Sequence, residues 1–182
     1  MSFSVGYEKK NNNKESLFMT IWNIIKRLKF SQFRHLFFLI LKYPIFMYPT
    51  LKATAISYNI TKKEYPKTHH LTGDGNAFRH ALWNILICYE CLKWKNNKIK
   101  VMAWAQIITD KHEELSPNKP LAKAMDLHNN AEGRNLFELF DFTTINDIIE
   151  VLKEKLLHSK KISAIDDVDN FTNEFVYIEN DI

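Results

Sequence analysis

The chain has 182 residues, which is enough for one well-buried domain but short for two. Its four glycines and five prolines supply few turns, which argues against a hairpin-rich β fold and favours long helices. The formal net charge of +4 is uneven, because residues 1–63 carry 11 basic and two acidic side chains whereas residues 162–182 carry six acidic ones and no basic one. The basic part can contact phosphate groups of lipid or nucleic acid, or the acidic tail can neutralise it.

The N-terminal third divides into a polar segment and a basic, aromatic-rich arm. Residues 1–15 contain the run EKKNNNK, which predicts disorder, and they lack the apolar stretch of a signal peptide. Residues 16–62 are predicted to form a helical arm that packs on the core or precedes it. Pro44 and Pro49 are expected to break helical structure there. The arm's helices are expected at residues 16–29, 31–42 and about 49–59.

The most apolar stretch of this arm is HLFFLILKYPIFMYPTL. Its uncharged runs, Leu36 to Leu41 and Tyr43 to Leu51, are well short of the roughly 18 residues of a spanning helix. We expect residues 16–60 to pack on the core, to touch an anionic lipid surface or to bind a protein partner. Nucleic acid is not expected as a partner, because no recognised binding motif is present. The predicted location is the cytoplasm or the membrane periphery, and secretion without a signal peptide stays open.

Residues 63–160 are predicted to form the central helical domain. Asp74 is expected to cap the first of its helices. Pro120 suits the first turn of a later helix, and the T-x-x-D spacing of Thr144 and Asp147 predicts a capped helix start. The expected helices span residues 74–95, about 99–115, 120–140 and 144–158.

The acidic tail, residues 161–182, contains apolar side chains that would let it dock on the domain. They are Phe171, Phe175, Val176, Tyr177 and Ile178. We recognise no strand pattern and no internal repeat. The predicted fold is therefore all-α, a single helical domain of about six to seven helices with a polar, histidine-rich centre.

Cys88 and Cys91 are the only cysteines, and they fall inside a predicted helix. A structural zinc site needs a second pair of ligands, and a redox C-x-x-C normally opens a helix after a strand. Neither condition is met here, so both residues are interpreted as small buried apolar side chains.

Three predicted helices each carry one histidine on the apolar stripe that faces the core, namely His80, His112 and His128. Side chains with polar atoms surround these histidines in larger number than a core normally holds. They are Asn76, Arg79, Trp83, Asn84, Asp110, Glu113, Asp126, Asn129, Asn130 and Arg134. Burying such groups unpaired costs of order 1–3 kcal/mol each, so they must pair with one another or bind a ligand.

Three interpretations of this polar cluster are open. The first is a structural cluster of mutually hydrogen-bonded side chains, which is the usual state of a buried histidine. The second is metal-free acid/base chemistry. The third is a site for a divalent metal such as Zn²⁺, Mn²⁺ or Fe²⁺, because mixed histidine and carboxylate ligation suits these ions.

The blocks NAFRHALWN, HEE and MDLHNNAEGR, in this order, resemble the signature of an uncharacterised bacterial domain family. That family is known as a C-terminal module of large wall-associated and polymorphic-toxin proteins and as short stand-alone proteins. The resemblance covers Gly73 to Arg134 and carries no established activity. It implies that the signature positions are Asn76, Arg79, His80, Trp83, Asn84, His112, Glu113, Asp126, His128, Asn129, Asn130, Gly133 and Arg134. The order H…HE…D is also similar to the H…HD…D pattern of helical metal-dependent phosphohydrolases, with Glu in place of Asp.

The leading hypothesis is a metal-dependent hydrolase of phosphoester or phospholipid substrates with a toxin- or effector-like role. Glu113 would be the general base on metal-bound water, and Arg79 or Arg134 would clamp an anionic group. The expected metal ligands are His80, His112, Asp126 and His128. The expected supporting residues are Asn76, Trp83, Asn84, Asp110, Asn129 and Asn130.

Two alternatives belong to other classes. One is a metal-free hydrolase of cell-wall glycan, with Glu113 as the acid and Asp126 as its carboxylate partner. The other is a non-catalytic helical binding module.

Overall fold

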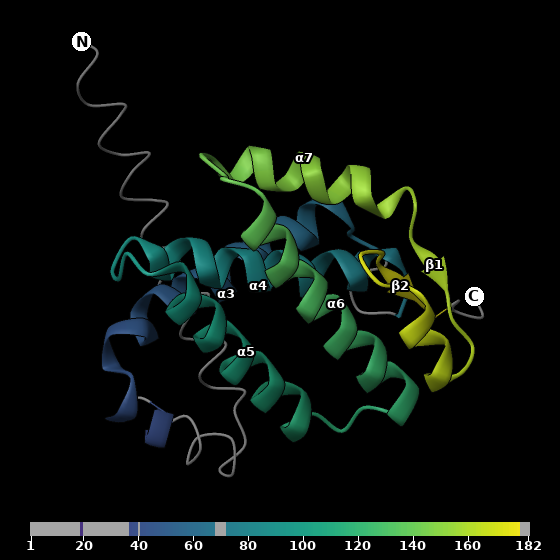
Figure 1. Ribbon diagram of the computed structural model, residues 1–182, viewed down its shortest axis with the longest axis horizontal. Helices are drawn as coiled ribbons and strands as arrows, with labels where there is room; N and C mark the ends of the chain where they lie inside the picture. Colours follow the sequence, from purple (N-terminus) through teal and green to yellow (C-terminus); the bar gives the residue numbers. More distant parts are fainter. Residues whose placement is uncertain (1–18, 20–36, 40, 68–71, 179–182) are drawn as a thin grey trace.

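The structure is a computed structural model that describes residues 19, 37–39, 41–67 and 72–178 (Figure 1). The described residues form a single all-α domain, which confirms the predicted fold class. Its helices are α3 (Pro44–Glu64), α4 (Asp74–Leu92), α5 (Lys98–Leu115), α6 (Pro120–Leu139) and α7 (Ile145–Leu156). The 3₁₀ helix η1 (Ile165–Asn170) and two strands, β1 (Lys160–Lys161) and β2 (Val176–Tyr177), follow.

The predicted disordered segment at residues 1–15 lies outside the described residues. So do most of the helices expected at residues 16–29 and 31–42, although residues 19, 37–39, 41 and 42 are helical.

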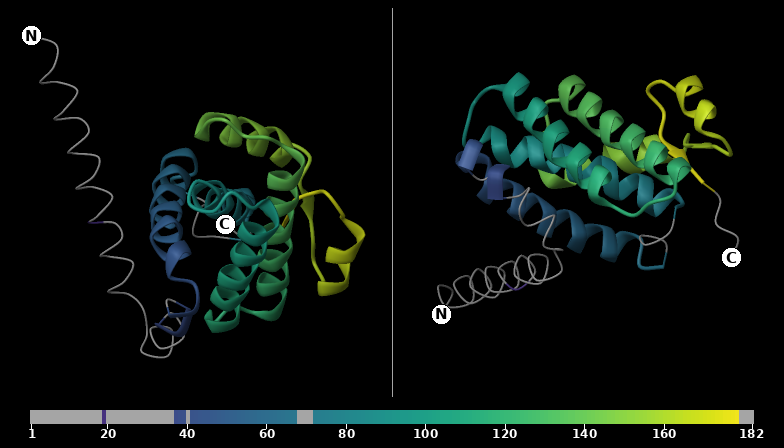
Figure 2. Two further views of the ribbon diagram at one scale, coloured as in Figure 1. Left: turned by 60° about the vertical axis from the view of Figure 1, so that its left-hand side comes forward. Right: turned by 90° about the horizontal axis from the view of Figure 1, so that it is seen from below.

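Helix α4 is the centre of the domain. Of its 19 residues, 14 are buried, and they include both apolar and polar side chains. It contacts α3, α5, α6 and α7, with α3 on one side and α6 with the C-terminal segment on the other (Figure 2). A helix covered on several sides has to satisfy its polar side chains inside the protein, which is why the polar residues of α4 decide what the domain can do.

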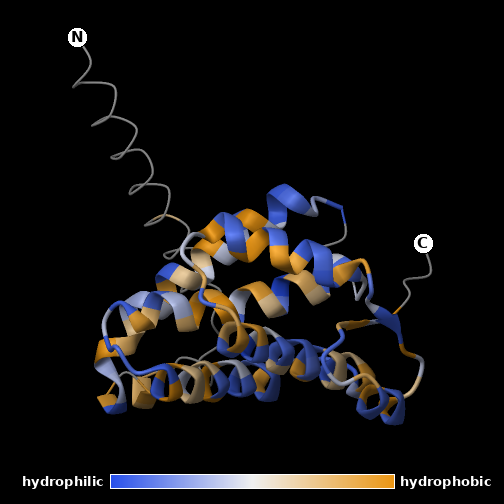
Figure 3. Cartoon of the chain, turned by 45° about the horizontal axis from the view of Figure 1, so that its top comes forward, coloured by the Kyte–Doolittle hydropathy of each residue, from blue (hydrophilic) through white to orange (hydrophobic). Residues whose placement is uncertain are grey.

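The apolar core surrounds α4. Helix α7 contributes Ile148, Leu152 and Leu156 at helical spacing, and its hydrophobic and hydrophilic residues alternate along the ribbon (Figure 3). Cys88 and Cys91 are buried free thiols in the same core, which confirms their interpretation as buried side chains.

The N-termini of the helices show which sequence signals predicted a helix start correctly. Thr144 and Asp147 form the predicted capping box, and Pro120 occupies the first turn of α6 as expected. Asp74 was predicted to cap α4, but the cap position is Gly73, and Asp74 contributes its charge to the first turn instead. Helix α5 begins with a cap from Asn97, whose side chain accepts a hydrogen bond from the Lys100 amide at 2.8 Å.

The prediction that Pro49 breaks the helical arm is wrong. Helix α3 begins at Pro44 and continues through Pro49 to Glu64, which extends the expected helix at both ends. Pro49 lacks the N–H that would bond to the carbonyl of Ile45. Ile45 lies in the exposed first turn of α3, where water can bond to the carbonyl that Pro49 leaves free.

The C-terminal segment docks on α6 and makes the short parallel pair β1–β2, although the sequence shows no strand pattern. The side chain of Asn129 accepts a hydrogen bond from Val176 N at 3.0 Å and donates one to Val176 O at 2.8 Å. Phe175 and Val176 are buried. Two-residue strands are too short to leave a periodic signal, so their formation depends on this tertiary docking.

In the described part of the chain, no helix combines the length and apolar character needed to cross a bilayer. Phe37, Phe38, Leu41, Ile45 and Tyr48 are exposed near the start of α3. The expected contact of residues 16–60 with a lipid surface falls largely on residues outside the described ones and stays a prediction.

Gly133 sets the distance between α4 and α6. A Cβ atom added at this position would lie 2.6 Å from the carbonyl oxygen of Ala81 and 2.7 Å from its Cα atom. Both are backbone positions of α4, so they cannot move aside without separating the two helices.

We therefore expect Gly133→Ala to lower the free energy of unfolding by about 1–3 kcal/mol through overpacking. Chemical denaturation followed by circular dichroism measures this change. Glu138→Ala, at an exposed position of the same helix, is the control and should stay within about 0.5 kcal/mol of the parent. Equal stability of the two variants would show that the helices do not approach this closely.

Candidate metal centre

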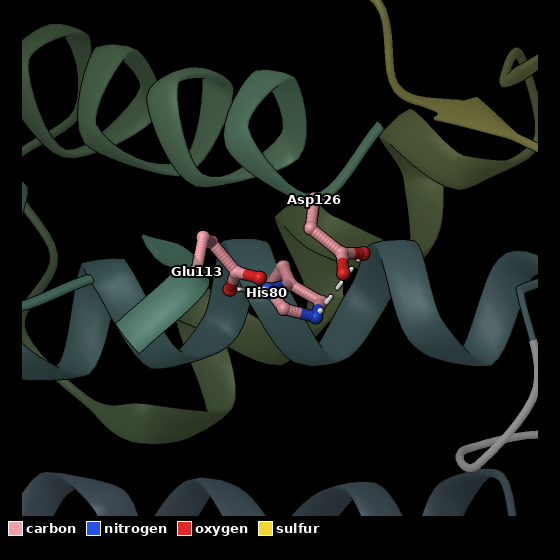
Figure 4. A group of neighbouring side chains, drawn as sticks. All are labelled: His80, Glu113 and Asp126. Atoms are coloured by element: carbon pink, nitrogen blue, oxygen red, sulfur yellow. Dashed lines mark ion pairs between the residues drawn. The ribbon is translucent and has the colours of Figure 1, made fainter. Parts of the chain in front are cut away.

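Three buried side chains from three helices meet beside α4: His80 from α4, Glu113 from α5 and Asp126 from α6 (Figure 4). One potential ligand atom from each lies within 4.8 Å of the others. The imidazole lies between the two carboxylates, with Nδ1 3.5 Å from Glu113 Oε1 and Nε2 3.3 Å from Asp126 Oδ1. These residues are called the His–Glu–Asp cluster below.

A network of amides holds the imidazole in place. Asn84 donates a hydrogen bond from Nδ2 to Asn130 Oδ1 at 2.7 Å, so this oxygen acts as an acceptor. His80 Nδ1 can then donate to the same oxygen at 3.2 Å, which leaves the lone pair on Nε2. Arg79 donates to Nε2 from Nη2 at 3.0 Å. The ring is thus oriented with its basic nitrogen toward Arg79 and Asp126.

The carboxylates of the cluster are incompletely satisfied. Both oxygens of Glu113, Oδ1 of Asp126 and Nδ2 of Asn130 are buried without a hydrogen bond of normal geometry among the described residues, although Asn130 is near enough to Glu113 to oppose the rise of its pKa. Asp126 Oδ2 does accept a hydrogen bond from Asn118 at 3.1 Å. Oxygen atoms in this condition cost free energy unless a proton, water or cation reaches them.

Burial changes the proton affinity of every member of the cluster. It raises the pKa of Glu113 to about 7, with Asp126 adding to the rise, and it raises the pKa of Asp126 to about 7 against the influence of Arg79. Burial and the charge of Arg79 lower the pKa of His80 well below its ordinary value, so the imidazole is neutral near pH 7. The neutral imidazole is already in the form that binds a metal ion, whereas the two carboxyl groups would have to release their protons to bind one.

A cavity of about 240 Å³ reaches the cluster from the side of α3. Of the cluster, His80 lines this cavity, and Arg79 and His112 lie beside it. Partial desolvation beside the cavity and the charge of Arg79 also lower the pKa of His112, although this residue is exposed at the surface. The remaining wall consists of Thr54, Ser57, Tyr58 and Trp83.

The two predicted arginines have different surroundings. Arg79 lines the cavity and lies near Asn76, whose Oδ1 accepts its hydrogen bond at 3.1 Å. Arg134 donates inside the protein to Asn84 Oδ1 at 2.9 Å and to Thr109 Oγ1 at 3.4 Å, and the charge of Asp110 acts on it. The geometry therefore favours Arg79 for contact with a ligand and gives Arg134 a packing role.

Two of the predicted histidine ligands lie outside the cluster. His128 directs Nε2 to the carbonyl of Glu174 at 2.8 Å, on the side of the C-terminal segment, and its neighbour Asn129 binds Val176 there. His112 lies against Trp83, with ring centroids 5.1 Å apart. The structure thus brings His80, Glu113 and Asp126 together and leaves His128 elsewhere.

The reason is a small error in the predicted helix faces. On α5 the buried line is Ala105, Thr109 and Glu113, whereas the spacing argument placed His112 on the core-facing stripe. On α6 the buried positions next to Asp126 are Asn129 and Asn130, whereas His128 is only partly buried. Each stripe is shifted by about one residue, which is a rotation of about 100° around the helix.

Sequence reasoning missed several residues of the site. Thr109 precedes Glu113 by four residues, and this spacing alone puts it on the same helix face. Asn118 lies in the loop before α6, and the wall of the cavity comes from α3. No pattern in the sequence indicates the last two contributions, because both depend on how distant segments pack.

Comparison with known proteins gives a family but no activity. Residues 37–160 match the protein family described as "Domain of unknown function (DUF6973)". The match is wider than the three signature blocks and includes α3, although the central domain was expected to begin at residue 63. No curated protein and no solved structure matches the chain.

We expect the unfolding free energy of chelator-treated protein to carry a contribution from Glu113 and Asp126 that falls as pH rises. Their pKa values are near 4.5 and 3.8 in the unfolded chain and about 7 in the folded protein. The folded state therefore holds more protons between about pH 4 and 7, and stability from this source is lost as pH rises through that window. Denaturant titrations at several pH values measure it.

Glu113→Gln and Asp126→Asn should each reduce that downward contribution. His80 and His112 act in the opposite direction because their pKa values are lowered, so the difference between variant and parent is the test, not the parent curve alone. Glu114→Gln, next in sequence but exposed, is the control. A Glu113→Gln curve parallel to that of the control would refute the assigned protonation.

Proposed function

We propose that this chain, which belongs to the family described as domain of unknown function DUF6973, is a metal-dependent hydrolase of phosphate esters. The observation that carries the proposal is the His–Glu–Asp cluster, in which three buried carboxylate oxygens lack a hydrogen bond and one from each carboxylate lies beside the same imidazole. A toxin- or effector-like role, which the signature blocks imply, belongs to the same proposal.

The donor set favours a divalent transition metal. Two carboxylates and one imidazole suit Zn²⁺, Mn²⁺ or Fe²⁺ and leave coordination positions for water and substrate. The separation of 3.3 Å between His80 Nε2 and Asp126 Oδ1 fits two ligands that each bind one ion at about 2.1 Å. Asn130 would orient the imidazole through Nδ1, as a hydrogen-bond acceptor does for many metal-bound histidines.

Hydrolysis of a phosphate ester in the cavity would need a positive charge to bind the phosphate and a proton acceptor to activate water. Arg79 lines the cavity and would hold an anionic oxygen of the substrate. In the structure Arg79 donates to His80 Nε2, so binding of the ion through this nitrogen requires Arg79 to release it and to turn toward the cavity. His112, neutral near pH 7, lines the same cavity and would take a proton from the attacking water.

This proposal revises the roles predicted from sequence. One oxygen of Glu113 lies within 4.8 Å of a ligand atom of His80 and of Asp126, so we assign Glu113 to the ion and the general base to His112. His128 is no longer assigned as a metal ligand, because its ring contacts the C-terminal segment. Asp126 and His80 keep their predicted roles as ligands.

The alternative of a metal-free glycan hydrolase has less support. Such enzymes place two carboxyl groups on either side of the scissile glycosidic bond, with room for the substrate between them. Glu113 is 0% exposed and Asp126 is 2% exposed, and His80 stands between them. A sugar ring cannot enter that space without unfolding the cluster.

Metal analysis tests the proposal directly. After incubation with Mn²⁺, Zn²⁺ or Fe²⁺ and removal of excess ion, the parent should retain stoichiometric metal and should hydrolyse phenyl phosphate or bis(4-nitrophenyl) phosphate. Asp126→Asn and His80→Ala should lose the metal and reduce the rate by about 100-fold or more, while their circular dichroism stays helical.

His158→Ala provides the control, because this histidine is exposed and distant in sequence from the cluster. It should retain the metal and the rate of the parent. Failure of the parent to retain any of these ions, or hydrolysis that a chelator leaves unchanged, would rule out the metal-dependent mechanism.

A further inference from the structure

We propose that the hydroxyl of Ser57 on α3 binds an oxygen of the substrate in the cavity, and that the substrate is a small phosphate ester with an apolar or planar organic group. The inference rests on the proposed function for the identity of the anion. It assigns a substrate-binding role to α3, a helix that sequence reasoning treated as an arm outside the signature domain.

The hydroxyl groups along α3 differ in whether they donate a hydrogen bond to the helix backbone. Thr50, Thr54 and Thr61 each donate a hydrogen bond to the carbonyl four residues earlier, at 2.6, 2.8 and 2.8 Å. Such bonds are the ordinary way for a buried helical hydroxyl to be satisfied. Ser57 lies among these residues and is 2% exposed, yet its Oγ has no hydrogen-bond partner among the described residues.

This difference is significant because an unpaired buried hydroxyl is costly. The backbone offers Ser57 the same type of acceptor that its three neighbours use. Ser57 instead lines the cavity that His80 and Arg79 also line. Its hydroxyl oxygen is covered in the structure, so a rotation of this short side chain would bring the hydroxyl, which is free of the helix hydrogen bonds, to a ligand oxygen in the cavity.

The opposite wall supplies the charge for that oxygen. Arg79 contributes a guanidinium group, and His112 contributes a ring nitrogen on the same side. A hydroxyl on one wall and a guanidinium on the other match the tetrahedral oxygens of a phosphate group.

The remaining wall is aromatic and fixed. Trp83 donates from Nε1 to Thr54 Oγ1 at 2.9 Å, which ties α4 to α3 and holds the indole at the cavity. Tyr58 lines the cavity as well. Such a wall contacts an apolar or planar group of the ligand, since its one indole N–H is already engaged.

The size of the cavity limits the ligand. A volume of about 240 Å³ is below the range of about 300–1,000 Å³ that is usual for drug-sized ligands. The cavity therefore fits one phosphate group with a small organic group and does not enclose a polymer strand.

The test measures binding of phenyl phosphate and of inorganic phosphate to the full chain by calorimetry, with chelator and again with Mn²⁺. Ser57→Ala should weaken phenyl phosphate binding by about tenfold or more, because it removes a hydrogen bond to a charged group. Its midpoint of thermal unfolding should not fall, since the hydroxyl has no protein partner to lose. Phenyl phosphate should bind more tightly than inorganic phosphate because of the aromatic wall.

Thr61→Val is the matched control, since it also removes one buried hydroxyl from α3, but a hydroxyl that donates to the helix backbone. It should leave the phosphate affinity unchanged. Ser57→Ala with the parent's affinity, or with a lower unfolding midpoint and no change in binding, would overturn the inference, and so would a parent that binds neither phosphate.

The two proposals fail separately. Metal-dependent hydrolysis in which Ser57→Ala keeps the KM of the parent would remove the Ser57 subsite and keep the hydrolase. Phosphate binding that depends on Ser57 in a protein that retains no metal and hydrolyses nothing would keep the subsite and remove the hydrolase.

Discussion

The close approach of α4 and α6 is the constraint on which the rest of the structure depends. With no side chain at Gly133, the backbone of α6 rests against Ala81 of α4. At this separation the short amides of Asn84 and Asn130 reach each other, at 2.7 Å, and Asp126 comes within 3.3 Å of His80. Helices packed around larger side chains lie 8–10 Å apart, and short polar side chains would then need longer replacements to meet.

The buried polar side chains between the helices form two groups, one with all its hydrogen bonds satisfied and one without. The first group is satisfied, since Asn84 donates two hydrogen bonds and accepts from Thr109 and Arg134. The other group, at Glu113 and Asp126, keeps oxygen atoms without partners. A fully paired network is rigid and specifies one arrangement, so it can hold the unpaired groups at a fixed geometry against their own repulsion. A ligand can therefore gain binding energy by pairing with the oxygen atoms of Glu113 and Asp126 that lack a hydrogen bond.

The sequence predicts much of this and fails at identifiable points. The all-α class and the start of α7 follow from local signals, because the capping box of Thr144 and Asp147 acts within a single turn. The inward face of α4 follows from its long apolar stripe. On α5 and α6, polar and apolar residues share neighbouring stripes, so periodicity alone could not choose Glu113 over His112. The role proposed for Ser57 depends on its hydroxyl having no hydrogen bond within the protein, which no sequence pattern can indicate.

The C-terminal segment holds α6 in its rotation about the helix axis. Asn129 binds both backbone groups of Val176, and Met125 packs in one cluster with that residue. Asp126 follows Met125 directly on α6, so the docked segment fixes the rotation of the helix that presents Asp126 to His80. Gly133 therefore sets how near α6 comes to α4, and the C-terminal segment determines which of its side chains face the cluster.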